Sequence, residues 1–235
     1  MSRLARLAVP CLCAPALLLA IGAPARAEVI LYQNTFESGV VGPYWSASAH
    51  IESHAAFSKY VGRYAGNESV VLSPPVPPAE GTIAVPPGGT TSGGEYRLYT
   101  LTFDFYAIDS WDGSATNNGP DWYKIWVNGR RIFAETFANT HPSQTFRAPD
   151  VGPTNLGYNA AWPDSIYRQI RVDFTLLAGE TTMAIRFAGE NLQELNDESW
   201  GIDNIKVAYQ VVPTPATTAL GVLGLGLASG RRRRR

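Results

Sequence analysis

The stretch Asp121-Trp-Tyr-Lys-Ile-Trp-Val127-Asn-Gly129-Arg-Arg-Ile-Phe-Ala-Glu-Thr-Phe137 places a two-residue turn between two segments rich in aromatic and β-branched residues. Asn128 and Gly129 favour the positive φ that both central positions of a type I′ turn require. The flanking residues favour strands, because such side chains pack well on a pleated surface. This stretch therefore predicts a β-hairpin.

Alternation with a period of two recurs through the body of the chain. Hydrophobic and polar side chains alternate along Tyr99 to Phe105, Ile170 to Leu176 and Met183 to Phe187, which predicts half-buried strands. Further strand segments are expected at Val29 to Phe36, Tyr44 to Ser48, Ser69 to Ser73 and Thr82 to Val85. Connections rich in glycine, proline and asparagine separate them. The expected fold class is all-β, an antiparallel two-sheet sandwich of the jelly-roll type.

The last expected strand changes parity along its length. Trp200 and Ile202 share one parity, whereas Ile205, Val207 and Tyr209 share the other. Because the side-chain period of a strand is two, one extra residue must lie between these groups. The sequence therefore predicts a β-bulge near Asp203-Asn204.

The N-terminal residues 1–27 are typical of a secretory signal peptide. A basic start precedes a run of leucines, and Ala25-Arg-Ala27 provides the small residues of a cleavage site at Ala25 and Ala27. We therefore expect a signal helix that is recognised by the secretion translocon and removed by signal peptidase. Both cysteines, Cys11 and Cys13, lie within it. Disulfides and cysteine-based sites are thus excluded from the mature protein.

The charge of the exported part differs from that of the whole chain. The signal peptide holds three of the 19 basic residues and the C-terminus holds five, which leaves 11 basic against 20 acidic side chains, a net charge of −9. An acidic surface of this kind argues against nucleic acid as a partner. Cations and neutral sugars remain compatible with it.

The C-terminal residues 212–235 form a third region after the expected domain, residues 28–211. Ala216 to Gly230 contains no charge and consists mainly of leucine, valine, alanine and glycine, and five consecutive arginines follow. We expect a hydrophobic helix in the inner membrane whose arginine cluster stays cytoplasmic. A plain C-terminal membrane anchor is one interpretation of this pattern.

This three-part tail resembles the PEP-CTERM sorting signal of Gram-negative bacteria. The matching positions are Pro213, Thr214, Pro215, Arg231, Arg232, Arg233, Arg234 and Arg235. Thr214 stands where the family's motif usually has glutamate. The resemblance implies that the protein is held transiently in the inner membrane and processed by an exosortase. It is then passed to the cell surface or to an exopolysaccharide matrix.

Four segments of the body resemble exported jelly-roll domains related in shape to carbohydrate-binding and laminin-G-like modules. They are Asn34 to Gly39, Gly62 to Ser69, Asp104 to Asp112 and Trp200 to Val207. The resemblance implies a surface- or matrix-associated structural or binding protein. A lectin-like module that binds polysaccharide, with or without Ca²⁺, and a glycan hydrolase are the alternatives.

One loop is dense in oxygen-bearing side chains. Its acidic residues Asp109, Asp112 and Asp121 are joined by Asn117 and Asn118. Since Ca²⁺ takes roughly six to eight oxygen ligands, this loop is a candidate calcium site. A solvated turn rich in Asx residues is the competing interpretation. Weaker candidates for a separate structural ion are Asp203, Glu198 and Glu37.

Aromatic residues in loops are candidates for stacking on sugar rings, because a ring combines broad apolar contact with a free edge. Trp111, Trp162 and Tyr158 are the predicted sugar-binding residues, whereas Trp126 and Trp200 lie in strand patterns and are expected in the core.

Catalytic motifs are missing from the sequence. There is no Gly-x-Ser-x-Gly, His-Glu-x-x-His or phosphate-binding glycine loop. A glycan hydrolase would need paired carboxylates. Glu194, Asp197 and Glu198 are available, but they do not follow the Glu-x-Asp-x-x-Glu pattern of laminarinase-like jelly rolls. We therefore expect no catalysis.

Overall fold

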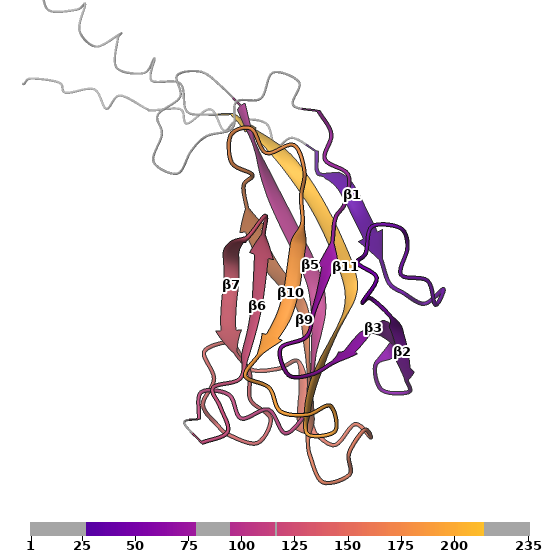
Figure 1. Ribbon diagram of the computed structural model, residues 1–235, viewed down its shortest axis with the longest axis vertical. Coiled ribbons are helices and arrows are strands. Elements are labelled where there is room, and N and C mark those ends of the chain that lie inside the picture. The colour runs from indigo at the N-terminus through magenta and orange to yellow at the C-terminus, as the bar shows by residue number, and fades with distance from the viewer. Residues whose placement is uncertain (1–26, 79–94, 116, 214–235) are drawn as a thin grey trace, which may run out of the picture.

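The computed structural model describes residues 27–78, 95–115 and 117–213, which form eleven strands in two antiparallel sheets (Figure 1). The seven-stranded sheet has the order β2-β3-β11-β5-β9-β8, and β1 also pairs with β11. Its strands are β1 (Val29–Asn34), β2 (Ile51–His54), β3 (Ser58–Tyr64), β5 (Glu95–Asp109), β8 (Val151–Thr154), β9 (Asp164–Phe174) and β11 (Glu198–Pro213). The four-stranded sheet has the order β4-β10-β6-β7. Its strands are β4 (Ser69–Leu72), β6 (Trp122–Val127), β7 (Arg130–Thr136) and β10 (Ile185–Glu190).

The two sheets pack face to face around one main hydrophobic core. Phe103 of β5 contacts Phe187 of β10, with ring centroids 5.9 Å apart, and Trp200 of β11 lies 5.2 Å from Tyr123 of β6. Both pairs join opposite sheets, so the inward-facing positions of the alternating segments form the interior. The expected all-β jelly-roll sandwich is confirmed.

The predicted hairpin is present as β6 and β7. Its turn residues Asn128 and Gly129 have φ of 48° and 80°. The side chain of Asn128 also accepts a hydrogen bond from the Ala184 N–H at 2.9 Å, which ties the turn to the chain before β10. The residues that alternate along β6 are buried at Tyr123, Ile125 and Val127. Local turn chemistry and burial thus agree at this hairpin.

Trp126 does not lie in the core, contrary to the expectation from the sequence. It lies on the other face of β6 from Tyr123 and Ile125 and is half-buried on the outer surface of the four-stranded sheet. The guanidinium of Arg186 stacks over its ring at 3.5 Å from the centroid. Trp200, by contrast, is fully buried as expected.

Some strands were missed or misplaced by the sequence pattern. Tyr44 to Ser48 forms no strand and contributes one isolated bridge, between Trp45 and Leu72. β2, β3 and β8 were not predicted, because two of them have four residues and β3 contains Gly62, which interrupts its alternation. Edge strands of this length give little periodic signal.

The end of the last strand and the limits of the described residues bear on the expected signal peptide and tail. β11 continues through Pro213, so the last strand includes the first two residues of the expected tail. The predicted signal helix, the C-terminal hydrophobic helix and the expected strand Thr82 to Val85 lie outside the described residues. No helix among the described residues has the length and hydropathy needed to cross a membrane.

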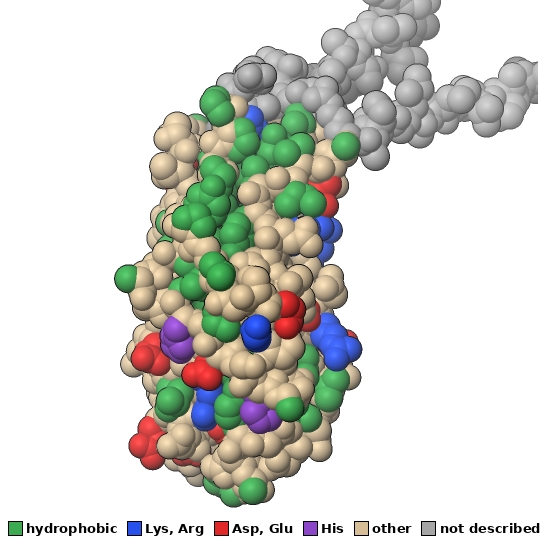
Figure 2. All heavy atoms as spheres, turned by 90° about the vertical axis from the view of Figure 1, so that its right-hand side faces the viewer, with side chains coloured by type: hydrophobic (Ala, Val, Ile, Leu, Met, Phe, Trp, Pro, Cys, Tyr) green, Lys and Arg blue, Asp and Glu red, His purple; other side chains and the backbone are tan. Residues whose placement is uncertain are grey.

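The side of the molecule formed by β1, β2 and β3 is divided in character (Figure 2). Hydrophobic side chains gather in its upper part, whereas acidic, basic and histidine side chains lie mostly in its lower half. The exposed hydrophobic residues of β1 and the loop after it are Val29, Ile30, Val40 and Tyr44. The charged side chains on this side of the molecule therefore lie mainly toward one end of the sandwich.

Candidate functional site

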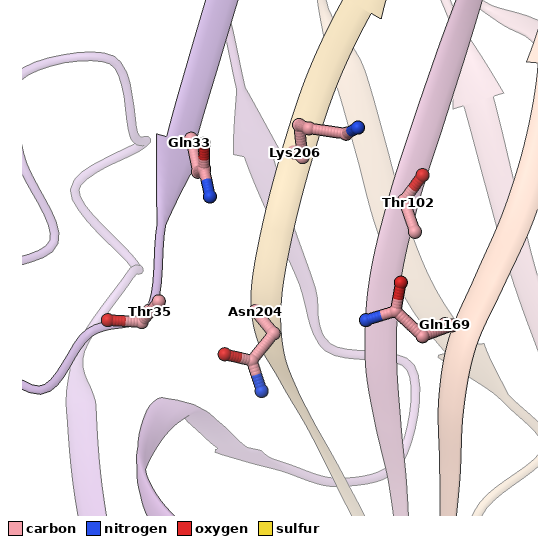
Figure 3. A pocket seen from close by; sticks show the side chains of 6 residues that line it. All are labelled: Gln33, Thr35, Thr102, Gln169, Asn204 and Lys206. Atoms are coloured by element: carbon pink, nitrogen blue, oxygen red, sulfur yellow. The ribbon is translucent and has the colours of Figure 1, made fainter.

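A polar trough lies on the outer face of the seven-stranded sheet (Figure 3). Its cavity has a volume of about 250 Å³ and is lined by Gln33, Thr35, Thr102, Gln169, Asn204 and Lys206. These residues come from β1 and the residue after it and from β11, β5 and β9, which are neighbours in the sheet. Gln33 and Thr102 both lie opposite Lys206 in the register, so they form one row across three strands.

Two β-bulges shape the floor of the trough. On β11 the register shifts between Asp203 and Lys206, and on β9 it shifts opposite Phe103 to Phe105. The bulged residues Asn204 and Gln169 have φ of 48° and 54°. The predicted bulge at Asp203-Asn204 is thereby confirmed. The second bulge lies at the same level on the other side of β5.

Asp104 of β5 holds both bulges. Its Oδ1 accepts the backbone N–H of Gln169 at 2.7 Å, and its Oδ2 accepts the side-chain amide of Asn204 at 2.9 Å. Asp104 itself is buried, so these two interactions are shielded from water. Hydrogen bonds to a carboxylate are stronger than those between neutral groups. The carboxylate therefore fixes the backbone on both sides of the trough.

Asp203 forms a second layer under Asn204. Its Oδ1 accepts the Asn204 backbone N–H at 2.6 Å, and its Oδ2 accepts the hydroxyl of Tyr106 at 2.9 Å. Burial is the main cause that raises the pKa of Asp203 from 3.8 to about 6. Asp203 is thus partly protonated in mildly acidic solution.

The raised pKa of Asp203 predicts a pH-dependent stability. The carboxyl of Asp203 has its ordinary pKa of 3.8 in the unfolded chain and a pKa of about 6 in the folded protein. Between these values the folded state binds more protons than the unfolded state, so the free energy of unfolding falls as pH rises. We expect Asp203 to contribute a loss on the order of 2 kcal/mol between about pH 4.5 and about pH 7.5. Urea unfolding of the wild type and of Asp203→Asn at both pH values measures it. Equal pH slopes in the two proteins would contradict the assignment.

The prediction that Trp111 binds sugar is wrong. Its side chain is fully buried, and its indole N–H donates to the carbonyl of Ser199 at 2.8 Å. Its ring packs against Phe105 and Phe137 of the core. A sugar cannot stack on a ring that the core encloses. The loop position of Trp111 in the sequence gave no sign that the ring turns inward.

Tyr158 and Trp162 lie apart from the trough residues, in the connection between β8 and β9. The ring of Tyr158 is half-buried, with His54 stacked on it at 4.4 Å between centroids and the Arg63 guanidinium 4.5 Å from its centroid. Protein groups thus already use the stacking capacity of Tyr158. Trp162 is 39% exposed and remains a predicted sugar contact.

The acidic residues of the predicted calcium loop separate into two groups. Asp109 bonds to the guanidinium of Arg63 at 2.8 Å. Asp112 and Asp121 are joined instead by Glu198 from the start of β11, and one carboxylate oxygen from each lies within 4.8 Å of the other two. We call Asp112, Asp121 and Glu198 the acidic triad. Asp109 therefore lies outside this group, contrary to the expectation from the sequence, whereas Glu198 belongs to it.

Burial disfavours the ionised form of the carboxyls in the acidic triad. Asp121 and Glu198 are fully buried, and this burial is the main cause that raises the pKa of both carboxyls far above the ordinary range. Two unit charges no more than 4.8 Å apart repel by at least about 3 kcal/mol at an effective dielectric constant of about 20. Among the described residues, no Lys or Arg forms an ion pair with the triad.

The remaining predicted acids occupy separate places. Asp197 accepts the hydroxyl of Ser110 at 2.7 Å, and Glu194 is exposed in the turn before β11. Glu37 is exposed and Asp203 is committed to the bulge, so neither joins the triad. Along β11, Glu198 lies about 20 Å from Asn204 at about 3.3 Å per residue. The acids considered for hydrolysis are therefore not in the trough.

Sequence reasoning did not identify the six trough residues as a site. The parity break pointed to Asn204, but nothing local connects Gln33, Thr102 or Gln169 with it. The strand order brings them together.

No protein-family model and no curated protein matches the sequence. Among solved structures, dimeric latent PorU from Porphyromonas gingivalis is similar at 14% identity and a TM-score of 0.43, over 82% of this chain and 13% of that chain. The Agl-KA catalytic domain is similar at 14% identity and a TM-score of 0.35, over 84% and 30%. CBM28, a carbohydrate-binding module specific for non-crystalline cellulose, is similar at 12% identity and a TM-score of 0.32, over 73% and 91%. These similarities concern the architecture alone.

Proposed function

We propose that this chain is an exported carbohydrate-binding protein whose polar trough contacts the hydroxyl groups of a neutral polysaccharide. The observation that carries the proposal is that five of the six residues lining the trough are amides or hydroxyls, on a face stiffened by two bulges. Amides and hydroxyls both donate and accept hydrogen bonds. They therefore match sugar hydroxyls, which also do both.

Four of the six side chains that line the trough are available to a ligand. Within the described part of the chain, no protein hydrogen bond engages the side chains of Gln33, Thr35, Thr102 or Gln169. Lys206 is the one cationic lining residue, and Glu28 binds its ammonium at 2.9 Å. The lining is thus close to electrically neutral, which favours an uncharged ligand.

The size and rigidity of the trough fit a segment of a polymer. Its volume of about 250 Å³ is below the roughly 300–1,000 Å³ of enclosed small-molecule pockets. Four of its six residues are exposed, so a chain could continue beyond the cavity in either direction. Since Asp104 and Asp203 fix the bulges beforehand, little ordering is required on binding.

Export to the surface is the second part of the proposal. It is supported by the signal peptide pattern of residues 1–27 and by the resemblance of residues 212–235 to the PEP-CTERM signal. Its partners would be the secretion translocon, signal peptidase, an exosortase and, transiently, the inner membrane. Delivery to an exopolysaccharide matrix would place the trough beside abundant polysaccharide.

Removing trough side chains should weaken polysaccharide binding without unfolding the protein. Gln33→Ala and Thr102→Val affect side chains on regular strands, and Gln169→Gly keeps a residue that accepts positive φ. Loss of each hydrogen bond costs about 1 kcal/mol, so the combined variant with three lost bonds should bind about 100-fold more weakly. A glycan array followed by calorimetry measures the change.

Trp126→Ala on the opposite outer face is the matched control for this experiment. Its side chain is partly exposed and lies on β6 of the four-stranded sheet, whereas the trough is formed by strands of the other sheet. Unchanged binding by this variant is expected. Loss of binding in Trp126→Ala, with full binding in the combined trough variant, would place the sugar site on the four-stranded sheet instead.

A further inference from the structure

Three separate parts of the chain contribute to the acidic triad. Asp112 follows β5, Asp121 precedes β6, and Glu198 begins β11. Glu198 lies opposite Asp109 in the pairing of β11 with β5, which brings it to the end of the sheet where the other two carboxylates lie. The group thus joins both sheets at one end of the sandwich.

The hydrogen bonds of the triad come from neutral donors. Gln193 donates its backbone N–H to Glu198 at 2.8 Å and its side-chain amide at 3.1 Å. The hydroxyl of Thr140 donates to Asp112 at 2.6 Å. The backbone N–H of Asp112 donates to Oδ2 of Asp121. These contacts orient the carboxylates but supply no positive charge.

One buried oxygen of the acidic triad lacks a hydrogen-bond donor. Asp121 is fully buried, and its Oδ1 is inaccessible to solvent and finds no N–H or hydroxyl donor; the carboxyl group of Glu198 lies beside it. Leaving a buried charged oxygen without a partner is strongly unfavourable. Asp121 also offers an oxygen to the group whose members lie within 4.8 Å of one another, so one cation among the three carboxylates would supply the missing positive charge.

We propose that the acidic triad binds one Ca²⁺ ion that fastens the Asp112–Asp121 loop to the start of β11. Ca²⁺ binds oxygen at about 2.3–2.6 Å, so ligands on opposite sides of one ion lie about 4.8 Å apart. The separations in the triad fall within this limit. The remaining ligands of the roughly six to eight that Ca²⁺ takes would come from groups outside the triad.

The type of ligand atom in the triad favours one class of metal ion. The triad contains carboxylate oxygens and neither histidine nor cysteine, which favours a hard cation over zinc or copper. Mg²⁺ requires oxygens at about 2.0–2.1 Å in a near-ideal octahedron and gives up its water ligands reluctantly, so a buried group of three carboxylates favours Ca²⁺ over it. This site is independent of the polysaccharide proposal, because it lies about 20 Å along β11 from the trough.

Thermal unfolding of the full chain, stripped with EDTA, tests the proposal. At a Ca²⁺ concentration about 100-fold above Kd, the Tm should rise by roughly 5–10 °C. The same concentration of Mg²⁺ should raise it much less. Terbium luminescence sensitised by Trp111, which precedes Asp112, should report occupation directly and should be displaced by Ca²⁺.

Asp121→Asn separates ion binding from folding. The amide keeps the shape of the side chain but removes one charge, so the metal-free variant should melt no lower than the wild type and should lose the Ca²⁺ response. Glu198→Gln should behave alike. Glu194→Gln, an exposed acid of the same connection, is the control and should retain the full response. A wild type whose Tm and terbium luminescence do not respond to the ions, or an Asp121→Asn variant with a wild-type response, would overturn the proposal.

Discussion

Replacing Trp111 by alanine should lower the free energy of unfolding by about 3–5 kcal/mol. Its side chain is fully buried, its ring lies 5.6 Å from that of Phe105, and its indole N–H bonds to Ser199 in β11. The substitution removes this packing and leaves the carbonyl of Ser199 without its side-chain donor. Because Trp111 links β5 to β11, we expect the loss to appear in the cooperative unfolding of the whole sandwich.

Chemical denaturation of Trp111→Ala and Trp162→Ala distinguishes the two loop tryptophans. Trp162 is 39% exposed, so its replacement should change stability by less than about 0.5 kcal/mol. A Trp111→Ala protein of wild-type stability that has lost sugar binding would show that Trp111 is a surface contact, contrary to the structure.

Asp104→Ala should remove polysaccharide binding and lower the free energy of unfolding by about 2–3 kcal/mol. The substitution deletes the acceptor of the Gln169 backbone N–H and of the Asn204 amide, which releases both bulges at once. Reduced repulsion of Asp203 offsets part of this loss, since the Asp104 charge is one cause of the raised Asp203 pKa. Binding should therefore suffer more than stability.

Asp173→Ala provides the control for Asp104→Ala. Asp173 also lies on the outer face, on β9, but it is exposed and bonds to Thr100 and Arg171 rather than to a bulge. Its loss should leave binding intact. If Asp104→Ala retains wild-type affinity, the bulges do not organise the sugar site.

Much of the fold follows from local sequence patterns. The Asn128-Gly129 turn and the alternation of Tyr123, Ile125 and Val127 predict the β6–β7 hairpin, because both signals lie within a few residues. The parity break before Ile205 predicts the bulge on β11 for the same reason. The short strands β2 and β8 could not be predicted, since four residues give too little periodicity.

The candidate sites depend on pairings that are distant in sequence. Gln33, Thr102 and Lys206 form a row only because β1, β11 and β5 are neighbours, and a period of two does not specify strand order. Likewise, Glu198 reaches Asp121 through the pairing of β11 with β5. Composition did indicate an acidic, oxygen-rich loop after β5. It could not show that Asp109 would pair with Arg63 instead.

Titration of a polysaccharide fragment into ¹⁵N-labelled protein tests the central claim most directly. Gln33, Gln169 and Asn204 each carry a side-chain amide in the trough, and each gives its own NMR signals (Figure 3). Binding at the trough should shift these amide signals first and leave unchanged the indole signals of Trp122 and Trp126, whose side chains lie on the outer face of the four-stranded sheet. Shifts confined to those indoles, or no shift with any polysaccharide, would contradict the account.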